Sequence, residues 1–89
     1  MHGPPKRTVY IIQSEAERSK FYTGITNDLP NRIYWHNRGA CRQTAEHRPW
    51  SLVVALDFRT EIDAVRFERY LKSGSGRAFA KRHFAPLGP

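Results

Sequence analysis

Two short runs rich in β-branched and aromatic residues, TVYIIQ (Thr8–Gln13) and FYTGIT (Phe21–Thr26), constrain the fold of this chain more than any other feature. Residues of this kind favour strands. Only the short polar connection SEAERSK separates the runs, so we expect the second strand to return antiparallel to the first. Because side chains alternate along a strand, Tyr22 and Gly24 are expected to share one face of the second strand.

The segment after the second strand carries the signals that begin and end a helix. Asn27 and Asp28 are both good N-cap residues, and Pro30 suits the first helical turn, where its missing N–H costs nothing. Gly39 is a suitable C-terminal stop because glycine readily adopts the left-handed backbone found there. The spacing predicts a helix that runs to about Arg38.

The second half of the chain predicts one more strand and two more helices. The run SLVVALDF (Ser51–Phe58) has apolar residues on both faces, as expected of a central strand that is covered on both sides. Thr60 can cap a second helix over residues 61–72. The SGSG turn then interrupts it, and Ser75 can cap a short third helix that ends at His83.

These elements predict an α+β fold in the order β-β-α-β-α-α. A three-stranded antiparallel sheet flanked by helices gives each amphipathic element a layer to pack against. The segment GACRQTAEHRPW, between the first helix and the third strand, is expected to be a long basic loop. At 89 residues we expect one domain over residues 1–89, with a core over about residues 7–84 and flexible ends at Met1–Pro5 and in the final APLGP.

The charge of the chain indicates a polyanionic partner. Fifteen Lys and Arg against eight Asp and Glu give a net charge of +7, and from Arg69 to the C-terminus there are basic residues but no acid. Nucleic acid is the usual partner of so basic a domain, and a merely solubilising charge is the alternative. The lone cysteine, Cys41, cannot form an intramolecular disulfide, and no apolar run is long enough for a membrane span, so we expect a cytoplasmic protein without a membrane partner.

A carboxylate in the second predicted helix is unusually placed. Ala64, Phe67 and Leu71 form an apolar stripe at helical spacing, and Glu68 falls on its edge. A carboxylate on an apolar flank is costly unless it is paired or holds a cation. One interpretation is a partly buried salt bridge to a neighbouring arginine. The other is a site for Mg²⁺, an ion that often takes one protein carboxylate and keeps several waters.

Four further positions are candidates for catalysis. Arg32 is either a solvated helix residue or a bidentate ligand for phosphate. His36, four residues later, could be a general base, a phosphate hydrogen-bond donor or an ordinary helix histidine. Tyr10 and Tyr22 are either packing aromatics or phenols that position a water, and a metal or arginine that lowered their pKa would let them deprotonate it. Gly24 lets backbone or substrate approach where a side chain would obstruct.

Taken together, these positions resemble a known nuclease family. Tyr10 in TVY, Tyr22–Gly24 in YTG, the helix with Arg32 and His36, and Glu68 in AVRFERYLK are similar to the motifs of the GIY-YIG nuclease domain. They occur in the order and approximate spacing of that family. The segments HNRGACRQTAEHRPW and LKSGSGRAFAKRHF resemble in particular the small, stand-alone bacterial members.

The resemblance covers nearly the whole chain, from about Arg7 to Phe84. Gly24 would be the structural glycine that ends the second motif. The sequence departs from the family's motifs at two positions, where Thr8 stands in place of glycine and Thr23 in place of isoleucine. Neither position carries a catalytic side chain in the family.

The resemblance implies hydrolysis of DNA phosphodiesters with one divalent metal. Glu68 would ligate Mg²⁺ or Mn²⁺, and Arg32 would bind the scissile phosphate. Tyr10 would be the general base or would orient the water, with Tyr22 assisting it. His36 occupies a position that in related branches engages the phosphate or the water. The general base could therefore be Tyr10 or His36.

Larger members of the family add a separate DNA-binding domain, for which we see no segment in this sequence. Recognition is therefore expected to rest on the basic surface of the domain or on a partner protein. The leading hypothesis is an endonuclease for branched, nicked or single-stranded DNA, with RNA as a further candidate polyanion. The alternatives are a nucleic-acid-binding module with weak or lost chemistry and a partner-dependent interaction domain. The candidate nucleic-acid contacts are Arg38, Arg42, Arg48, Lys72, Arg77, Lys81 and Arg82.

Overall fold

The computed structural model describes residues 4–84 and confirms the predicted α+β architecture. The predictions for the two ends fall largely on residues 1–3 and 85–89, which lie outside the described residues. Within residues 4–84, none of the helices has the length and apolar character needed to cross a membrane. The elements are β1 (Thr8–Ser14), β2 (Phe21–Thr26), α1 (Leu29–Asn37), α2 (Arg42–Ala45), β3 (Trp50–Asp57), α3 (Glu61–Leu71) and α4 (Gly74–His83).

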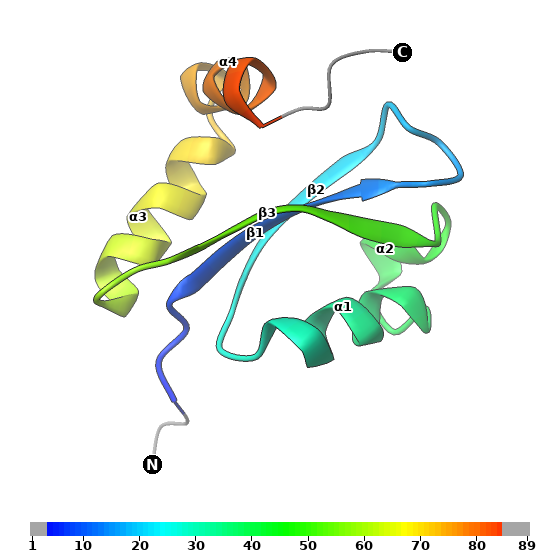
Figure 1. The fold of residues 1–89 in the computed structure, drawn as a ribbon, viewed down its shortest axis with the longest axis horizontal. Coiled ribbons are helices and arrows are strands. Elements are labelled where there is room, and N and C mark those ends of the chain that lie inside the picture. The colour runs from blue at the N-terminus through cyan, green and yellow to red at the C-terminus, as the bar shows by residue number, and fades with distance from the viewer. Residues whose placement is uncertain (1–3, 85–89) are drawn as a thin grey trace.

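The three strands form one antiparallel sheet in the order β2-β1-β3. The expectation that the third strand is central is therefore wrong, because β1 occupies the middle and β3 is an edge strand. The apolar pattern of β3 has another cause. Helices cover both faces of the sheet, as Figure 1 shows, and a strand between two layers buries both sets of side chains even at an edge.

Each face of the sheet has its own hydrophobic core, with α1 and α2 on one side and α3 and α4 on the other (Figure 1). The alternation along β1 divides its side chains between the two cores, as predicted. The core under α3 is built on Val9, Ile11, Ala64 and Leu71, with Phe67 packed against it. The core under α1 is built on Tyr10, Ile12 and Trp50, with Tyr22, Leu29 and Ile33 packed against it.

Local capping determines where the helices begin and end. The Asp28 carboxylate and the Thr60 hydroxyl each accept a hydrogen bond from the backbone N–H three residues later, which confirms both predicted N-caps. Gly39 follows α1 with a φ of +84°, as predicted for a helix stop. The prediction for the last helix is wrong by two residues, because Ser73 caps it in place of Ser75.

The segment predicted to be a long loop contains the one-turn helix α2, which is too short to show a helical period in the sequence. The indole N–H of Trp50 donates a hydrogen bond of 2.7 Å to the backbone carbonyl of Thr44. The side chain of Asn37 exchanges two hydrogen bonds with the backbone of Trp50, at 2.6 and 3.1 Å. These contacts hold α1, α2 and the start of β3 together.

The junction between α3 and α4 depends on Gly76, which is buried in the first turn of α4. A Cβ at this position would lie 2.5 Å from the carbonyl carbon of Tyr70 and 2.6 Å from the Cα of Leu71. Both contacts are to backbone, which cannot swing aside. Glycine is therefore needed for α4 to pack closely against the end of α3.

Candidate active site

The centre of the candidate active site is a hydrogen bond between Tyr10 on β1 and His36 on α1. The Tyr10 hydroxyl and His36 Nε2 are 2.7 Å apart, and both side chains are almost entirely removed from solvent. The two residues are 26 positions apart in the sequence. They meet because α1 packs on the face of the sheet to which Tyr10 points.

A second hydrogen bond determines the tautomer of His36. Its Nδ1 lies 2.8 Å from the Thr44 hydroxyl, and that hydroxyl donates to the carbonyl of Cys41 at 3.4 Å. The Thr44 oxygen therefore accepts from Nδ1–H, so Nε2 carries the lone pair that accepts the Tyr10 proton. Thr44 is a site residue that the sequence analysis missed, since it lies in the segment expected to be a loop.

Because both ring nitrogens are occupied and the ring has no exposed surface, His36 cannot touch water or phosphate directly in this structure. Of the three interpretations of this histidine, the direct phosphate donor disagrees with the geometry. The arrangement allows His36 to act only through Tyr10.

The electrostatics keep the histidine neutral and the phenol protonated. Burial lowers the pKa of His36, and the nearby Arg32 charge lowers it further. Burial raises the pKa of Tyr10, and so does Tyr22, whereas the opposing effect of Arg32 is smaller. The expectation that an arginine would lower the pKa of the phenol is therefore wrong for Tyr10 in this structure. The phenol donates a hydrogen bond to a neutral imidazole, which is a base ready to receive a proton.

Gly24 makes room for the Tyr10 ring. The two residues are direct partners in the pairing of β1 with β2. A Cβ on Gly24 would lie 2.5 Å from Tyr10 Cζ and 2.8 Å from Cε1, distances that a real side chain does not tolerate. The sequence analysis expected a glycine that allows a close approach, and the approaching group is the catalytic candidate itself.

Tyr22 and Arg32 lie beside this pair. The Tyr22 ring is 5.0 Å from the His36 ring and 6.4 Å from the Tyr10 ring. The Arg32 guanidinium stacks on Trp35, 4.5 Å from the ring centroid, and this cation–π contact holds it in place. Within residues 4–84 Arg32 makes no salt bridge, so its charge is available to an anion.

Glu68 lies across from these groups on α3 and is paired with Lys72, 2.7 Å away. The predicted salt bridge to an arginine is thus wrong in its partner, because the lysine one turn later reaches the carboxylate. The Glu68 side chain is only 18% exposed. Its charge raises the pKa of both Tyr10 and Tyr22, as expected if the carboxylate lies near both phenols. The fold therefore brings all five catalytic candidates into one neighbourhood, reached from β1, β2, α1 and α3.

The residues around Glu68 fit a divalent ion held by few protein ligands. No group of three or more His, Cys, Asp or Glu side chains comes together in the part of the chain that the structure describes. A single, largely buried carboxylate supplies one hard oxygen ligand, which suits an ion that retains most of its waters. The Lys72 ammonium beside this carboxylate shows that the position already attracts a cation.

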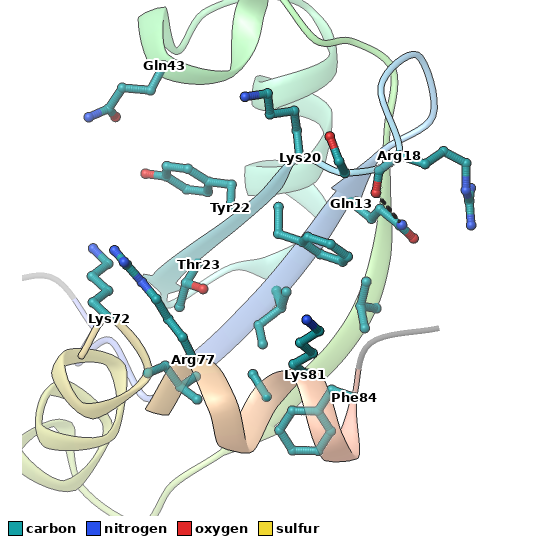
Figure 2. A pocket seen from close by; sticks show the side chains of 16 residues that line it. Gln13, Arg18, Lys20, Tyr22, Thr23, Gln43, Lys72, Arg77, Lys81 and Phe84 are labelled. Atoms are coloured by element: carbon teal, nitrogen blue, oxygen red, sulfur yellow. Dashed lines mark hydrogen bonds between the residues drawn. The ribbon is translucent and has the colours of Figure 1, made fainter. Parts of the chain in front are cut away.

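The predicted nucleic-acid contacts separate into two groups. Lys72, Arg77 and Lys81 line a groove of about 1160 Å³ that includes Tyr22 and lies between the β2 end of the sheet and α4, shown in Figure 2. We call it the β2–α4 groove. Arg18 and Lys20, from the β1–β2 connection, also line it, and the sequence analysis missed both. The groove does not include Arg38, Arg42, Arg48 and Arg82.

The basic residues outside the groove differ in their contacts. The Arg48 guanidinium donates to the carbonyl of Ala45 at 2.7 Å. The Arg38 guanidinium lies 5.8 Å from the Tyr34 ring centroid. Arg42 and Arg82 are exposed. As contacts to nucleic acid these four arginines remain predictions.

Comparison with known proteins agrees with this fold and site. A family model described as the GIY-YIG catalytic domain matches residues 6–82, so the chain belongs to the GIY-YIG catalytic domain family. Nucleases of this family are metal-dependent endonucleases.

Individual relatives come from fungi and bacteria. The structure-specific endonuclease subunit SLX1 of Scheffersomyces stipitis is 43% identical over 67 residues, which cover 67% of this chain and 20% of that protein. The SLX1 subunit of Meyerozyma guilliermondii is 31% identical over 96 aligned residues, covering 91% of this chain and 32% of the relative. UPF0213 protein YazA of Bacillus subtilis is 38% identical over 64 residues, covering 71% of this chain and 63% of the relative. The chain thus spans less than two thirds of each relative.

Proposed function

We propose that this chain is a divalent-metal-dependent endonuclease that hydrolyses DNA phosphodiester bonds at branched, nicked or single-stranded structures. The observation that carries the proposal is the buried hydrogen bond from Tyr10 to a neutral His36, with Arg32 and Glu68 on either side. The printed names of the SLX1 relatives, which describe structure-specific endonuclease subunits, support the choice of branched substrates.

Arg32 and Glu68 would position the scissile phosphate. The Arg32 guanidinium can bind two phosphate oxygens and stabilise the negative charge that builds in the transition state. Glu68 would hold Mg²⁺ or Mn²⁺ once Lys72 has moved away. When bound, the ion would act as a Lewis acid that neutralises charge on the phosphate.

Tyr10 and His36 would activate the water. The Tyr10 oxygen takes a proton from the attacking water while its own proton passes to His36 Nε2, which is free to accept it. The resulting hydroxide forms the new P–O bond, the bond to the leaving oxygen breaks, and that oxygen takes a proton from solvent. Thr44 holds the imidazole in the required tautomer, and Tyr22 lies where its hydroxyl can help orient the water.

Cleavage assays on a panel of DNA structures test this proposal. Purified protein is incubated with labelled flap, four-way junction, nicked, single-stranded and duplex DNA in Mg²⁺ or Mn²⁺, beside Glu68→Gln and Arg32→Ala. We expect cleavage of at least one non-duplex structure and a loss on the order of 10²–10³-fold in each variant. Absence of cleavage by the wild type, or equal cleavage by Glu68→Gln purified in parallel, would contradict the proposal.

One contact favours a second candidate function, a nucleic-acid-binding module with weak chemistry. Lys72 neutralises the carboxylate that would hold the metal, and unless it is displaced it excludes the ion. In that case Mn²⁺ would fail to bind the wild type at millimolar concentration, and Lys72→Met would acquire both binding and cleavage. A protein partner, as the word subunit in the names of the SLX1 relatives suggests, is the third part of the proposal. Full activity of the isolated chain on naked DNA would make such a partner unnecessary.

A further inference from the structure

The β2–α4 groove is lined by cations from three parts of the chain and by no acid. Two of its five cations are already paired, Arg18 with Glu15 at 2.8 Å and Lys72 with Glu68 at 2.7 Å. The other three make no salt bridge within residues 4–84. These free cations are Lys20, Arg77 and Lys81.

Apolar side chains lie between these cations. Phe21, at the start of the edge strand β2, is 43% exposed and lines the groove. The apolar residues Val53, Ala80 and Phe84 line it as well. An exposed aromatic ring among cations is a costly surface in water, and it is the combination with which proteins bind single strands, where bases stack on rings and phosphates meet the charges.

The size and position of the groove favour a polymer over a small molecule. Its volume of about 1160 Å³ exceeds the range of roughly 300–1,000 Å³ that holds drug-sized ligands. It begins at Tyr22, one of the catalytic candidates. Figure 2 shows Lys72 and Arg77 extending from the ends of α3 and α4 toward the same part of the groove as Tyr22. A strand that leaves the active site would therefore enter the groove directly.

We propose that the β2–α4 groove holds a single DNA strand next to the scissile bond, with a base stacked on Phe21 and phosphates bound by Arg77 and Lys81. A duplex has no unstacked base to offer Phe21, because its bases are stacked on one another and only its phosphates face the protein. The groove therefore directs the domain toward DNA with a single-stranded arm. This assignment rests on the proposed endonuclease function.

Binding measured without metal separates the groove from the chemistry. The fluorescence anisotropy of a labelled single strand, the matching duplex and the same sequence as RNA is followed in EDTA, where no cleavage occurs. Phe21→Leu keeps an apolar side chain and removes the ring, and Phe21→Trp enlarges the ring. Arg77→Glu reverses one free charge. The controls are Leu52→Ala, on the other edge strand at 45% exposure, and Arg66→Glu, an exposed α3 residue outside the groove.

We expect Phe21→Leu to weaken single-strand binding by roughly 5- to 150-fold, the range for removing one base–aromatic stack, and duplex binding by much less. Phe21→Trp should bind the single strand more tightly. Arg77→Glu should reduce the salt dependence of single-strand binding by about 0.7 in log–log slope, or more, for each phosphate that the variant no longer binds. The two controls should bind both DNAs as the wild type does. Circular dichroism of each variant checks that the fold is retained.

Three results would overturn the assignment: equal weakening of single-strand and duplex binding by Phe21→Leu, equal effects of Arg77→Glu and Arg66→Glu, or RNA bound as tightly as DNA. Glu68→Gln distinguishes the two proposals, since it should bind the single strand as the wild type does and cleave nothing. If the wild type binds as expected and cleaves no substrate, the groove assignment stands and the proposed function fails.

Discussion

Replacing Gly24 with alanine should damage the site because the added methyl group would overlap the ring of Tyr10. The new Cβ would lie 2.5 Å from Tyr10 Cζ, and ordinary van der Waals contact begins at 3.4 Å. The ring must therefore retreat by 0.9 Å, the difference between these two distances. A retreat of that size along the hydrogen bond takes the Tyr10–His36 distance from 2.7 Å to about 3.6 Å, which is beyond hydrogen-bonding range.

The cost follows from these displacements. Overpacking a core costs about 1–3 kcal/mol, a buried polar group left without a partner costs about 1–3 kcal/mol, and glycine to alanine in a strand returns about 0.5–1 kcal/mol. Because the ring moves only partly, we expect a net loss of about 2 kcal/mol in the free energy of unfolding. For a domain of this size that loss lowers Tm by about 8–16 °C. Cleavage should fall by about 100-fold, since the group that activates the water is misplaced by nearly 1 Å.

Urea unfolding and cleavage of a flap substrate measure the two effects. The decisive comparison is a double-variant cycle with Tyr10→Leu, because leucine has no atom where the ring meets the new methyl group. In that background Gly24→Ala should cost little or nothing, so the two substitutions should couple by at least 1 kcal/mol. If Gly24→Ala costs the same in both backgrounds, the glycine serves some other need than room for the ring, and the reasoning is refuted.

The geometry also makes predictions for Lys72, His36 and the junction glycines. Lys72→Met should tighten Mn²⁺ binding by about two- to fivefold, as seen by electron paramagnetic resonance, because it removes an ammonium that competes at Glu68; unchanged affinity would show that the ion binds elsewhere. Because the pKa of His36 is lowered, the unfolded chain takes up a proton below pH 6.5 that the folded one refuses, so both the free energy of unfolding and kcat/KM should fall as pH drops below that value, and His36→Gln should remove this part of the stability change. Gly76→Ala should destabilise by about 1–3 kcal/mol in urea, whereas Gly74→Ala, with nothing within 4 Å of the new Cβ, should be neutral or stabilising.

Much of the fold could be predicted from the sequence because its signals are local. Asp28, Thr60 and Gly39 mark helix ends through contacts with their own neighbours, so they act alike in any context. The alternation along β1 is likewise a property of one strand, which is why the face of Tyr10 was predicted correctly. The face of Gly24 followed from the same rule.

The features that escaped prediction depend on which segments meet. The apolar pattern of β3 shows that both its faces are covered and says nothing of the strands beside it, so the pattern could not distinguish an edge strand from a central one. The burial of His36 and its contact with Thr44 require α1 to pack between the sheet and α2, which no helical spacing reveals. The groove combines the β1–β2 connection with α4, two segments more than 50 residues apart.

Tyr10 and His36, 2% and 0% exposed, are among the most deeply enclosed side chains of the described protein. Few substitutions there can tune reactivity while leaving stability alone, because any change in size or polarity is felt by the surrounding core. Attempts to evolve or redesign this domain should therefore leave the pair untouched and work on the rim, where Lys72, Phe21 and Arg77 can be exchanged at little structural risk.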